Sequence, residues 1–200
     1  MSDKIQIKVN TTLYPVPVVL ISCGAGEEAN VFSLNRISSC NAEPPMIAIS
    51  VRPGRASHDI IDRHGEFVVN IPWPEMEIVS DFVGTTTTRD TDKWTETGLT
   101  QLKAVEVQPP LLSDCPVNIE CRVVHRLRLP SHSLFLAEVI ALHAEEEILD
   151  DHGEVDFALA GGGLPYRAGP VREKPVYNFR PDELLQQVHL WRDARRKLEI

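Results

Sequence analysis

Strand-like segments follow one another along most of this sequence and limit the folds that it can adopt. Gly, Pro, Asn and Asp separate them, and the longer period of a helix is rare between them. The five clearest segments are YPVPVVLIS, PPMIAISVR, GEFVVNIP, CPVNIECRVVHRLRLP and HSLFLAEVIALHAEEEIL. The pattern predicts a mainly β protein with a few short helices. Closing such strands into a barrel would remove the exposed edges that invite aggregation.

The fourth of these segments alternates most strictly. Its apolar positions are Val117, Ile119, Cys121 and Val123. The positions between them are Asn118, Glu120, Arg122 and Val124. Because successive side chains of a strand point to opposite faces, we expect one face in the core and the other in a wetter environment.

Length and charge narrow the possible classes further. The chain has 200 residues, is 42% hydrophobic and contains no linker of low complexity, which suits one domain with a C-terminal appendage. No apolar run approaches the roughly 20 residues of a membrane span, and the first ten residues are polar, so we expect a cytoplasmic protein without a membrane partner. The net charge of −9 argues against nucleic acid as a partner. A bound nucleotide would need a local basic site.

The cysteines and histidines carry no metal-site pattern. The cysteines lack CxxC pairs, so four buried and reduced thiols are expected at Cys23, Cys40, Cys115 and Cys121. The seven histidines are scattered without an HExxH or similar cluster. We therefore expect no metal.

Residues 24–29, GAGEEA, fit the G-x-G-x-x-[G/A] fingerprint of dinucleotide-binding turns. Two observations weaken that reading: Glu27 and Glu28 would repel a pyrophosphate, and the chain lacks the alternation of strands and helices of a doubly wound sheet. A glycine-permitted turn between two strands is the preferred interpretation. The glycines at 161–163 lack the Lys-Ser/Thr pair of a P-loop and are interpreted as a loop.

The segment RPGRAS, residues 52–57, has the composition of an anion-binding turn. Pro53 and Gly54 favour a turn, Ser57 is a candidate cap for a short helix, and Gly65 suits the position after its end. A helix N-terminus beside Arg52 and Arg55 would hold a terminal phosphate. The alternative, equally supported by these residues alone, is that Ser57 only caps the helix while the arginines are solvated.

The C-terminal segment RPDELLQQVHLWRDARRKLEI predicts an amphipathic helix. Acidic residues stand near its start and basic residues near its end, which matches the helix dipole. Its apolar stripe comprises Leu184, Leu185, Val188, Trp191 and Leu198. The stripe fits either this chain's own domain or a partner subunit.

Five further segments stand in this order along the chain: PVPVVLISCG, SLNRISSCNAEPPMIAISVRPGRASHDIIDRHGEFVVNIP, GTTTTRDTDKWTETGLT, CPVNIECRV and HSLFLAEVIALH. Together they resemble the flavin reductase-like, FMN-binding split-barrel family, close to its flavoredoxin branch. The resemblance implies a six-stranded antiparallel split β-barrel with a few short helices. It also implies a homodimer with flavin near the subunit interface. The expected organisation is a split-barrel domain over 1–170 and a C-terminal extension with an amphipathic helix over 171–200.

The resemblance implies that Asn30 to Ser38 runs beside the flavin ring and ribityl chain, and that Ser50 to His58 holds the phosphate. Arg89 and Lys93, in the polar segment 85–94, are candidates to close over the flavin or to contact the phosphate of a nicotinamide donor; a solvated loop is the alternative. The expected cofactor-binding residues are Asn30, Ser33, Leu34, Asn35, Arg36, Ile37, Ser38, Ser50, Val51, Arg52, Arg55, Ser57, His58, Arg89 and Lys93.

These residue types suit a flavin. Amide and hydroxyl groups can serve its pyrimidine edge, and the apolar residues Phe32, Leu34 and Ile37 between them can cover the ring. A polar-faced strand and loop is the alternative. No catalytic side chain is named, because hydride transfer between stacked rings requires mainly alignment and exclusion of water.

The leading hypothesis is an NAD(P)H-dependent flavin reductase, or a flavoredoxin-type electron carrier that works with a redox partner, using FMN. The alternatives are an FMN-binding protein without reductase activity, which stores or transfers the cofactor, and a structural or regulatory dimer that has lost the ligand.

Overall fold

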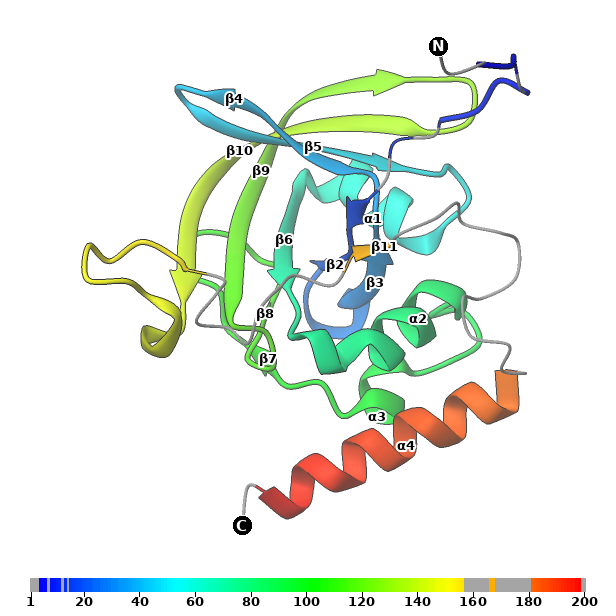
Figure 1. The fold of residues 1–200 in the computed structure, drawn as a ribbon, viewed down its shortest axis with the longest axis vertical. Coiled ribbons are helices and arrows are strands. Elements are labelled where there is room, and N and C mark those ends of the chain that lie inside the picture. The colour runs from blue at the N-terminus through cyan, green and yellow to red at the C-terminus, as the bar shows by residue number, and fades with distance from the viewer. Residues whose placement is uncertain are drawn as a thin grey trace.

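A computed structural model describes residues 4–6, 8–11, 13, 15–156, 166–167 and 181–198, and its main element is a curved antiparallel sheet (Figure 1). The sheet has seven strands in the order β3-β2-β6-β9-β10-β5-β4. Their bounds are β2 Val19–Cys23, β3 Asn30–Leu34, β4 Ile37–Ala42, β5 Pro45–Val51, β6 Glu66–Ile71, β9 Val117–Arg128 and β10 Ser133–Ala144. The expectation of a mainly β protein is confirmed.

The two edge strands of this sheet, β3 and β4, are consecutive in the chain. Only Asn35 and Arg36 join Leu34 to Ile37, so the two edges come within roughly 10 Å of each other at this point. The sheet therefore curls into a barrel whose first and last strands meet end to end instead of pairing side by side. This is a split barrel, and it has six strands when residues 30–42 are counted as one bent strand.

Short elements complete the fold. Two small antiparallel pairs flank the sheet: β1 (Val16–Pro17) with β11 (Tyr166–Arg167), and β7 (Gln101–Leu102) with β8 (Leu111–Leu112). The helices are α1 Ala56–His64, α2 Glu77–Thr85, α3 Lys93–Thr97 and α4 Pro181–Leu198, with 3-10 turns η1 Gly26–Glu28, η2 Pro74–Met76 and η3 Glu146–Ile148. Within the described part of the chain, no helix combines the length and the apolar character that crossing a membrane requires.

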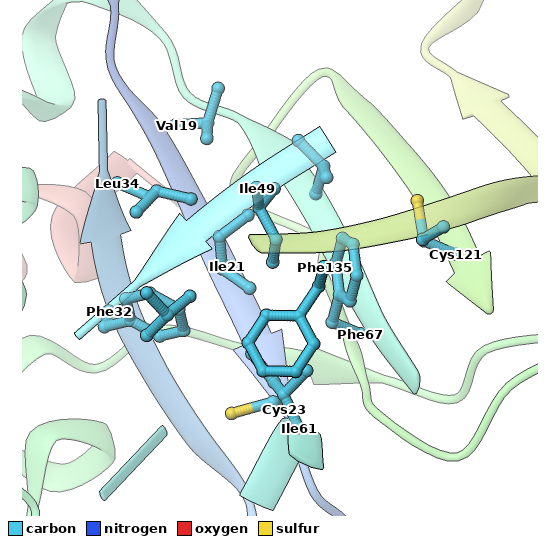
Figure 2. Packing of buried hydrophobic residues seen from close by; sticks show 13 residues of the cluster. Val19, Ile21, Cys23, Phe32, Leu34, Ile49, Ile61, Phe67, Cys121 and Phe135 are labelled. Carbon is cyan, nitrogen blue, oxygen red and sulfur yellow. The ribbon is translucent and has the colours of Figure 1, made fainter. Parts of the chain in front are cut away.

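The barrel interior holds the main hydrophobic cluster (Figure 2). Phe67 and Phe135 are the largest of its fully buried side chains. The expected core face of β9 is present, since Val117 and Cys121 are buried. The opposite face of β9 differs from the expectation: Asn118 and Glu120 are buried too. Hydrogen bonds from residues 105–107 to Glu120, and from Asn118 to the Leu112 carbonyl, show that the 101–112 segment covers this face.

A second hydrophobic layer lies outside the barrel. Helix α2 packs on β3, and α4 packs in turn on α2 and α3, as Figure 1 shows. Leu184 and Val188 of α4 are buried against Val79 and Phe82 of α2. The predicted apolar stripe is therefore confirmed at Leu184, Leu185, Val188 and Trp191, and α4 packs on its own chain, which was one of the two expected docking surfaces. The side chain of Leu198 lies outside the described residues.

Two further expectations can be compared with the structure. Residues 24–29 (GAGEEA) connect β2 and β3 in an antiparallel hairpin, which confirms the interpretation as a turn between two strands. Gly24 has φ +70°, and a Cβ there would lie 2.4 Å from the Glu28 carbonyl oxygen, so the turn requires glycine.

The expectation of four buried thiols is wrong for Cys40, which is exposed on the edge strand β4. The loop proposed at 161–163 lies outside the described residues.

Candidate functional site

The N-terminus of α1 lies directly after the turn that follows β5. Arg55 is the N-cap residue, with extended backbone angles, and no side chain caps the helix. The expectation that Ser57 caps α1 is therefore wrong: Ser57 is already inside the first turn and buried, whereas a capping side chain must come from the non-helical residue before it. Gly65 ends the helix in the left-handed conformation, as expected (φ 70°).

Lys93 is a buried residue, so the solvated loop given above as the alternative for segment 85–94 is wrong at this position. It is the first residue of α3 and is only 3% exposed. Its ammonium group donates hydrogen bonds of 2.8 Å to the carbonyl oxygens of Val31 and Val83, which leaves one of its three donors. Burial, and after it the guanidinium of Arg55, lowers the pKa of Lys93 to about 8. Lys93 and Arg55 thus lie within electrostatic range of each other.

Arg89, the other basic candidate of segment 85–94, has a different environment from Lys93. It is exposed in the loop before α3, where its backbone N–H bonds to the Thr87 hydroxyl at 3.4 Å.

Strand β3 divides its side chains between two surroundings. Phe32 and Leu34 point into the barrel core, and strand alternation places Asn30 on the same face. Ser33 faces α2 instead, where a Cβ on Gly84 would lie 3.0 Å from the Ser33 Cβ. The polar groups expected to line one ligand therefore lie on two faces. Asn30 is 3% exposed, and its Oδ1 has no hydrogen-bond partner among the described residues.

The corner between β3 and β4 packs against the end of β5. The Ser50 N–H donates to the Arg36 carbonyl oxygen at 3.0 Å, which fixes the corner beside the last residues of β5. Arg36 and Ser38 are exposed, Asn35 is half-buried, and Ile37 packs against the barrel core. Val51 is itself a core residue.

His58 links α1 to β10. One ring nitrogen, Nε2, lies 2.8 Å from the Ser133 hydroxyl, and the other, Nδ1, lies 3.1 Å from a carboxylate oxygen of Asp59. The ring also packs against Phe135, with 5.6 Å between centroids. These contacts hold the helix that follows the 52–55 turn against the barrel.

A histidine that the sequence analysis did not single out lies beside the arginines. Burial and the charges of Arg36 and Arg52 lower the pKa of His132, which is in the β9–β10 turn. The cationic groups therefore form two sets: Arg55 with Lys93, and Arg36 with Arg52 and His132. Only the pairing of strands distant in sequence brings the second set together, so no local spacing could have revealed it.

The three arginines of these two sets differ from other arginines of the chain in the ion pairs that they form with described residues. Among the described residues, Arg36, Arg52 and Arg55 form no ion pair with a carboxylate. Five other arginines do form such pairs: Arg63, Arg122, Arg126, Arg192 and Arg195. In a chain with net charge −9, unpaired cations gathered at one corner of the barrel are typical of an anion-binding site.

The fold is that of a split-barrel protein, and cationic side chains gather at one corner of the barrel. Among solved structures, the flavoredoxin of Methanosarcina acetivorans matches with a TM-score of 0.76 and 28% identity, over 88% of this chain and 97% of that chain. The flavoredoxin of Desulfovibrio vulgaris (Miyazaki F) has the same fold, with a TM-score of 0.75 and 23% identity, over 88% of this chain and 98% of that one.

Sequence relatives indicate the same family. An NADH-dependent FMN reductase of Streptomyces nodosus subsp. asukaensis is 28% identical over 134 residues, which are 67% of this chain and 71% of the relative. The family model for the flavin reductase like domain matches residues 11–160. The chain belongs to the flavin reductase-like family.

Proposed function

We propose that this protein is an NAD(P)H-dependent flavin reductase that binds FMN at the corner formed by β3, the Asn35–Arg36 link, the 52–58 segment and Lys93. The observation that carries the proposal is the start of α1 after Arg55, an arginine that forms no ion pair with a carboxylate among the described residues and that lies within electrostatic range of the buried Lys93. The first N–H groups of α1, which no side chain caps, lie directly after Arg55. A phosphate monoester would satisfy these N–H donors and both charges.

The residues on the barrel side fit the remainder of FMN. The buried Oδ1 of Asn30 has no described partner and can accept a hydrogen bond from a ribityl hydroxyl or from the pyrimidine edge. The exposed link at Asn35 and Arg36, with Ser38 beyond it, offers further polar groups along the ring. Leu34, Ile37 and Val51 give the corner its apolar side.

When bound, the flavin would supply the redox chemistry by accepting a hydride from the nicotinamide donor. The chain's own contribution is to hold the ring, exclude water from one face and present cations near it. A positive charge at Arg36 would favour the reduced, more negative form of the ring. We therefore assign Arg36 a tuning role rather than a proton-transfer role.

The similarity to an NADH-dependent FMN reductase supports the nicotinamide donor. The flavoredoxin neighbours support a second possibility at the same site, an electron carrier that passes reducing equivalents to a redox partner. An FMN-binding protein without reductase activity is the alternative, and it differs in giving no reaction with reduced nicotinamide.

We further propose a homodimer with the flavin near the subunit interface. The β9 and β10 strands and the turn between them expose apolar side chains at Val124, Leu127, Leu129 and Leu142. A second copy of the chain would cover such a surface and the open side of the ring. In this proposal the split-barrel domain spans 1–170, and the extension 171–200 reinforces it through α4.

Binding titrations with FMN and riboflavin test the phosphate site. Arg55→Met is expected to weaken FMN at least tenfold, because a charge-assisted hydrogen bond contributes roughly 1.5 to 3 kcal/mol, and to leave riboflavin unchanged. Lys103→Met, which removes an exposed charge between β7 and β8, is the control and should change neither. Equal weakening of both ligands by Arg55→Met would contradict the phosphate assignment.

A further inference from the structure

We propose that Arg192 of α4 is a positioning residue, which holds the C-terminal end of α3 and, through α3, fixes the start of β3 and the place of Lys93. The docking of α4 is thereby coupled to flavin binding. The last step, from β3 to flavin affinity, rests on the proposed function, whereas the contact of α4 with α3 does not.

Arg192 lies directly on the end of α3. Its Nη1 atom donates to the carbonyl oxygens of Thr95 and Glu96, at 3.1 and 3.2 Å. The last carbonyl groups of a helix have no partner within the helix, so the guanidinium satisfies groups that α3 itself leaves open. Gly98 ends α3 with φ +68°, and a Cβ there would lie 2.7 Å from the Arg192 Cγ. The contact therefore depends on glycine at this position.

Two neighbouring side chains of α4 strengthen this contact. The Nε2 atom of His189 lies 2.5 Å from a carboxylate oxygen of Glu96. Arg195 forms an ion pair with the buried Asp114, in the turn after β8. Residues three apart share a side of a helix, so the side of α4 that carries Arg192 binds both α3 and this turn.

The other end of α3 holds the start of β3. As Figure 1 shows, α3 lies against α4. Lys93 and Trp94, at the start of α3, donate hydrogen bonds of 2.8 to 2.9 Å to carbonyl oxygens at the start of β3 and in α2. Within α3, the Thr97 hydroxyl donates to the Lys93 carbonyl at 2.7 Å. A shift of the C-terminal end of α3 is therefore transmitted to Lys93 and Trp94.

Helix α3 has two states in this account, closed and locally open. It has only five residues, and helices this short are not stable without tertiary contacts. Loss of the Arg192 hydrogen bonds raises the population of the open state, in which the Lys93 ammonium reaches water. A ligand that requires the closed state loses affinity in proportion to the closed fraction.

The test is acetylation of the full-length chain with N-acetoxysuccinimide, with mass spectrometry to measure the reaction at Lys93. Arg192→Met is expected to speed this reaction roughly tenfold, as follows from the loss of a charge-assisted hydrogen bond. Gly98→Ala disturbs the same contact from the side of α3 and should also speed it. Arg196→Met removes an exposed arginine of the same helix and is the matched control, which should keep the wild-type rate.

Urea dependence separates local opening from global unfolding. Cys121 lies in the barrel core, so the reaction of its thiol with a maleimide reports global unfolding. Local opening exposes little surface and responds weakly to urea. In Arg192→Met, the acetylation of Lys93 should therefore change little at low urea concentrations, while the reaction of Cys121 rises steeply. The same steep slope for both residues would contradict local control by Arg192.

Titrations with FMN and riboflavin test the coupling to the flavin site. The double variant His189→Leu/Arg192→Met should weaken both ligands by the same factor, roughly threefold or more, because both require the closed state. This pattern differs from that of Arg55→Met, which is expected to weaken FMN alone.

Three outcomes would overturn the inference. Unchanged acetylation of Lys93 in Arg192→Met, or an equal increase in Arg196→Met, would remove the positioning role. Faster acetylation in the double variant with unchanged binding of both ligands would remove the coupling to the flavin. Wild-type protein that takes up no FMN would instead refute the proposed function, and the acetylation of Lys93 would still decide whether Arg192 holds α3.

Discussion

The ammonium group of Lys93 lies 2.8 Å from the carbonyl oxygen of Val31, and this hydrogen bond ties α3 to the strand that carries Asn30. The neighbouring Trp94 adds a second tie, because its indole N–H donates to the Ala29 carbonyl at 2.9 Å. Two consecutive side chains of one short helix thus fix the start of β3. The position of Asn30, and with it one wall of the proposed flavin site, depends on α3.

We predict that Lys93→Met lowers the free energy of unfolding by at least about 2 kcal/mol, because it leaves the carbonyls of Val31 and Val83 buried without a donor. Urea denaturation followed by circular dichroism measures this loss. Lys103→Met is the control, since that lysine is exposed, and should change stability by less than about 0.5 kcal/mol. Similar curves for the two variants would show that the Lys93 bonds contribute little.

The lowered pKa of Lys93, about 8, predicts how FMN binding depends on pH. A phosphate dianion near the ammonium favours its protonated form, so the pKa of Lys93 is higher in the complex than in the free protein. Affinity is therefore greatest below pH 8 and falls as the pH rises through 8 and beyond. The FMN phosphate has its second pKa at about 6 and stays dianionic in this range. Fluorescence titrations between pH 7 and 9.5 should show the fall for FMN and not for riboflavin; a parallel fall for riboflavin would refute the assignment.

Helix α4 is predicted to be part of the stable core. Leu184→Ala removes a side chain buried against α2 and should cost about 2 to 5 kcal/mol in unfolding free energy. Leu190→Ala, on the same helix but at a position 63% exposed, is the matched control and should cost less than about 0.5 kcal/mol. Thermal unfolding compares the two variants. A small effect of Leu184→Ala would mean that α4 packs elsewhere in solution.

Glu120 is predicted to stabilise the fold as a buried carboxylate. Burial acts to raise its pKa, but hydrogen bonds from three backbone N–H groups and the His143 imidazole outweigh burial and hold the pKa below the ordinary value. Because the pKa is lower in the folded state, the stabilisation is present above the unfolded value of about 4.5 and is lost as pH falls below it. Glu120→Gln should therefore destabilise the protein at pH 7 and reduce the loss of stability between pH 5 and pH 3. A variant with the wild-type acid profile would exclude this role.

Oligomeric state is tested by light scattering on the full chain and on a chain that ends at Lys174. We predict a dimer for the full chain, with the flavin lost when the dimer dissociates. A monomer that holds one FMN tightly would contradict the shared site. An unchanged dimer after truncation would remove only the role of the extension in assembly.

Local patterns in the sequence were sufficient for β2, β5, β6, β9 and β10 and for the stripe of α4, whereas β3 and β4 were not among the strand-like segments. The alternation around Cys121 gave the core face of β9, and the glycines at 24 and 26 gave a hairpin turn. The short helix α3 also had a sequence signal that was not used: Asp92 caps it, accepting from the Trp94 and Thr95 N–H groups, and Gly98 ends it.

Features that depend on distant segments could not be predicted. Glu120 is buried because the 101–112 segment folds over β9, and nothing near Glu120 in the sequence encodes that cover. The burial of Lys93 could not be predicted either, because charged residues of polar segments are usually exposed, and a solvated loop was the alternative given for segment 85–94. Arg36 lies near His132 because the β3–β4 link and the β9–β10 turn both lie beside the end of β5. The pairing of these distant strands produces this arrangement, so the local sequence could not predict it.

Anaerobic addition of NADH, and separately of NADPH, to protein loaded with FMN tests the proposed function most directly. The visible absorption of oxidised flavin reports the reaction, with free FMN at the same concentration as the control. We predict that one of the two donors bleaches the protein-bound flavin far faster than it bleaches free FMN. Bound flavin that keeps its absorption with both donors would contradict the reductase and favour an FMN-binding protein without this activity.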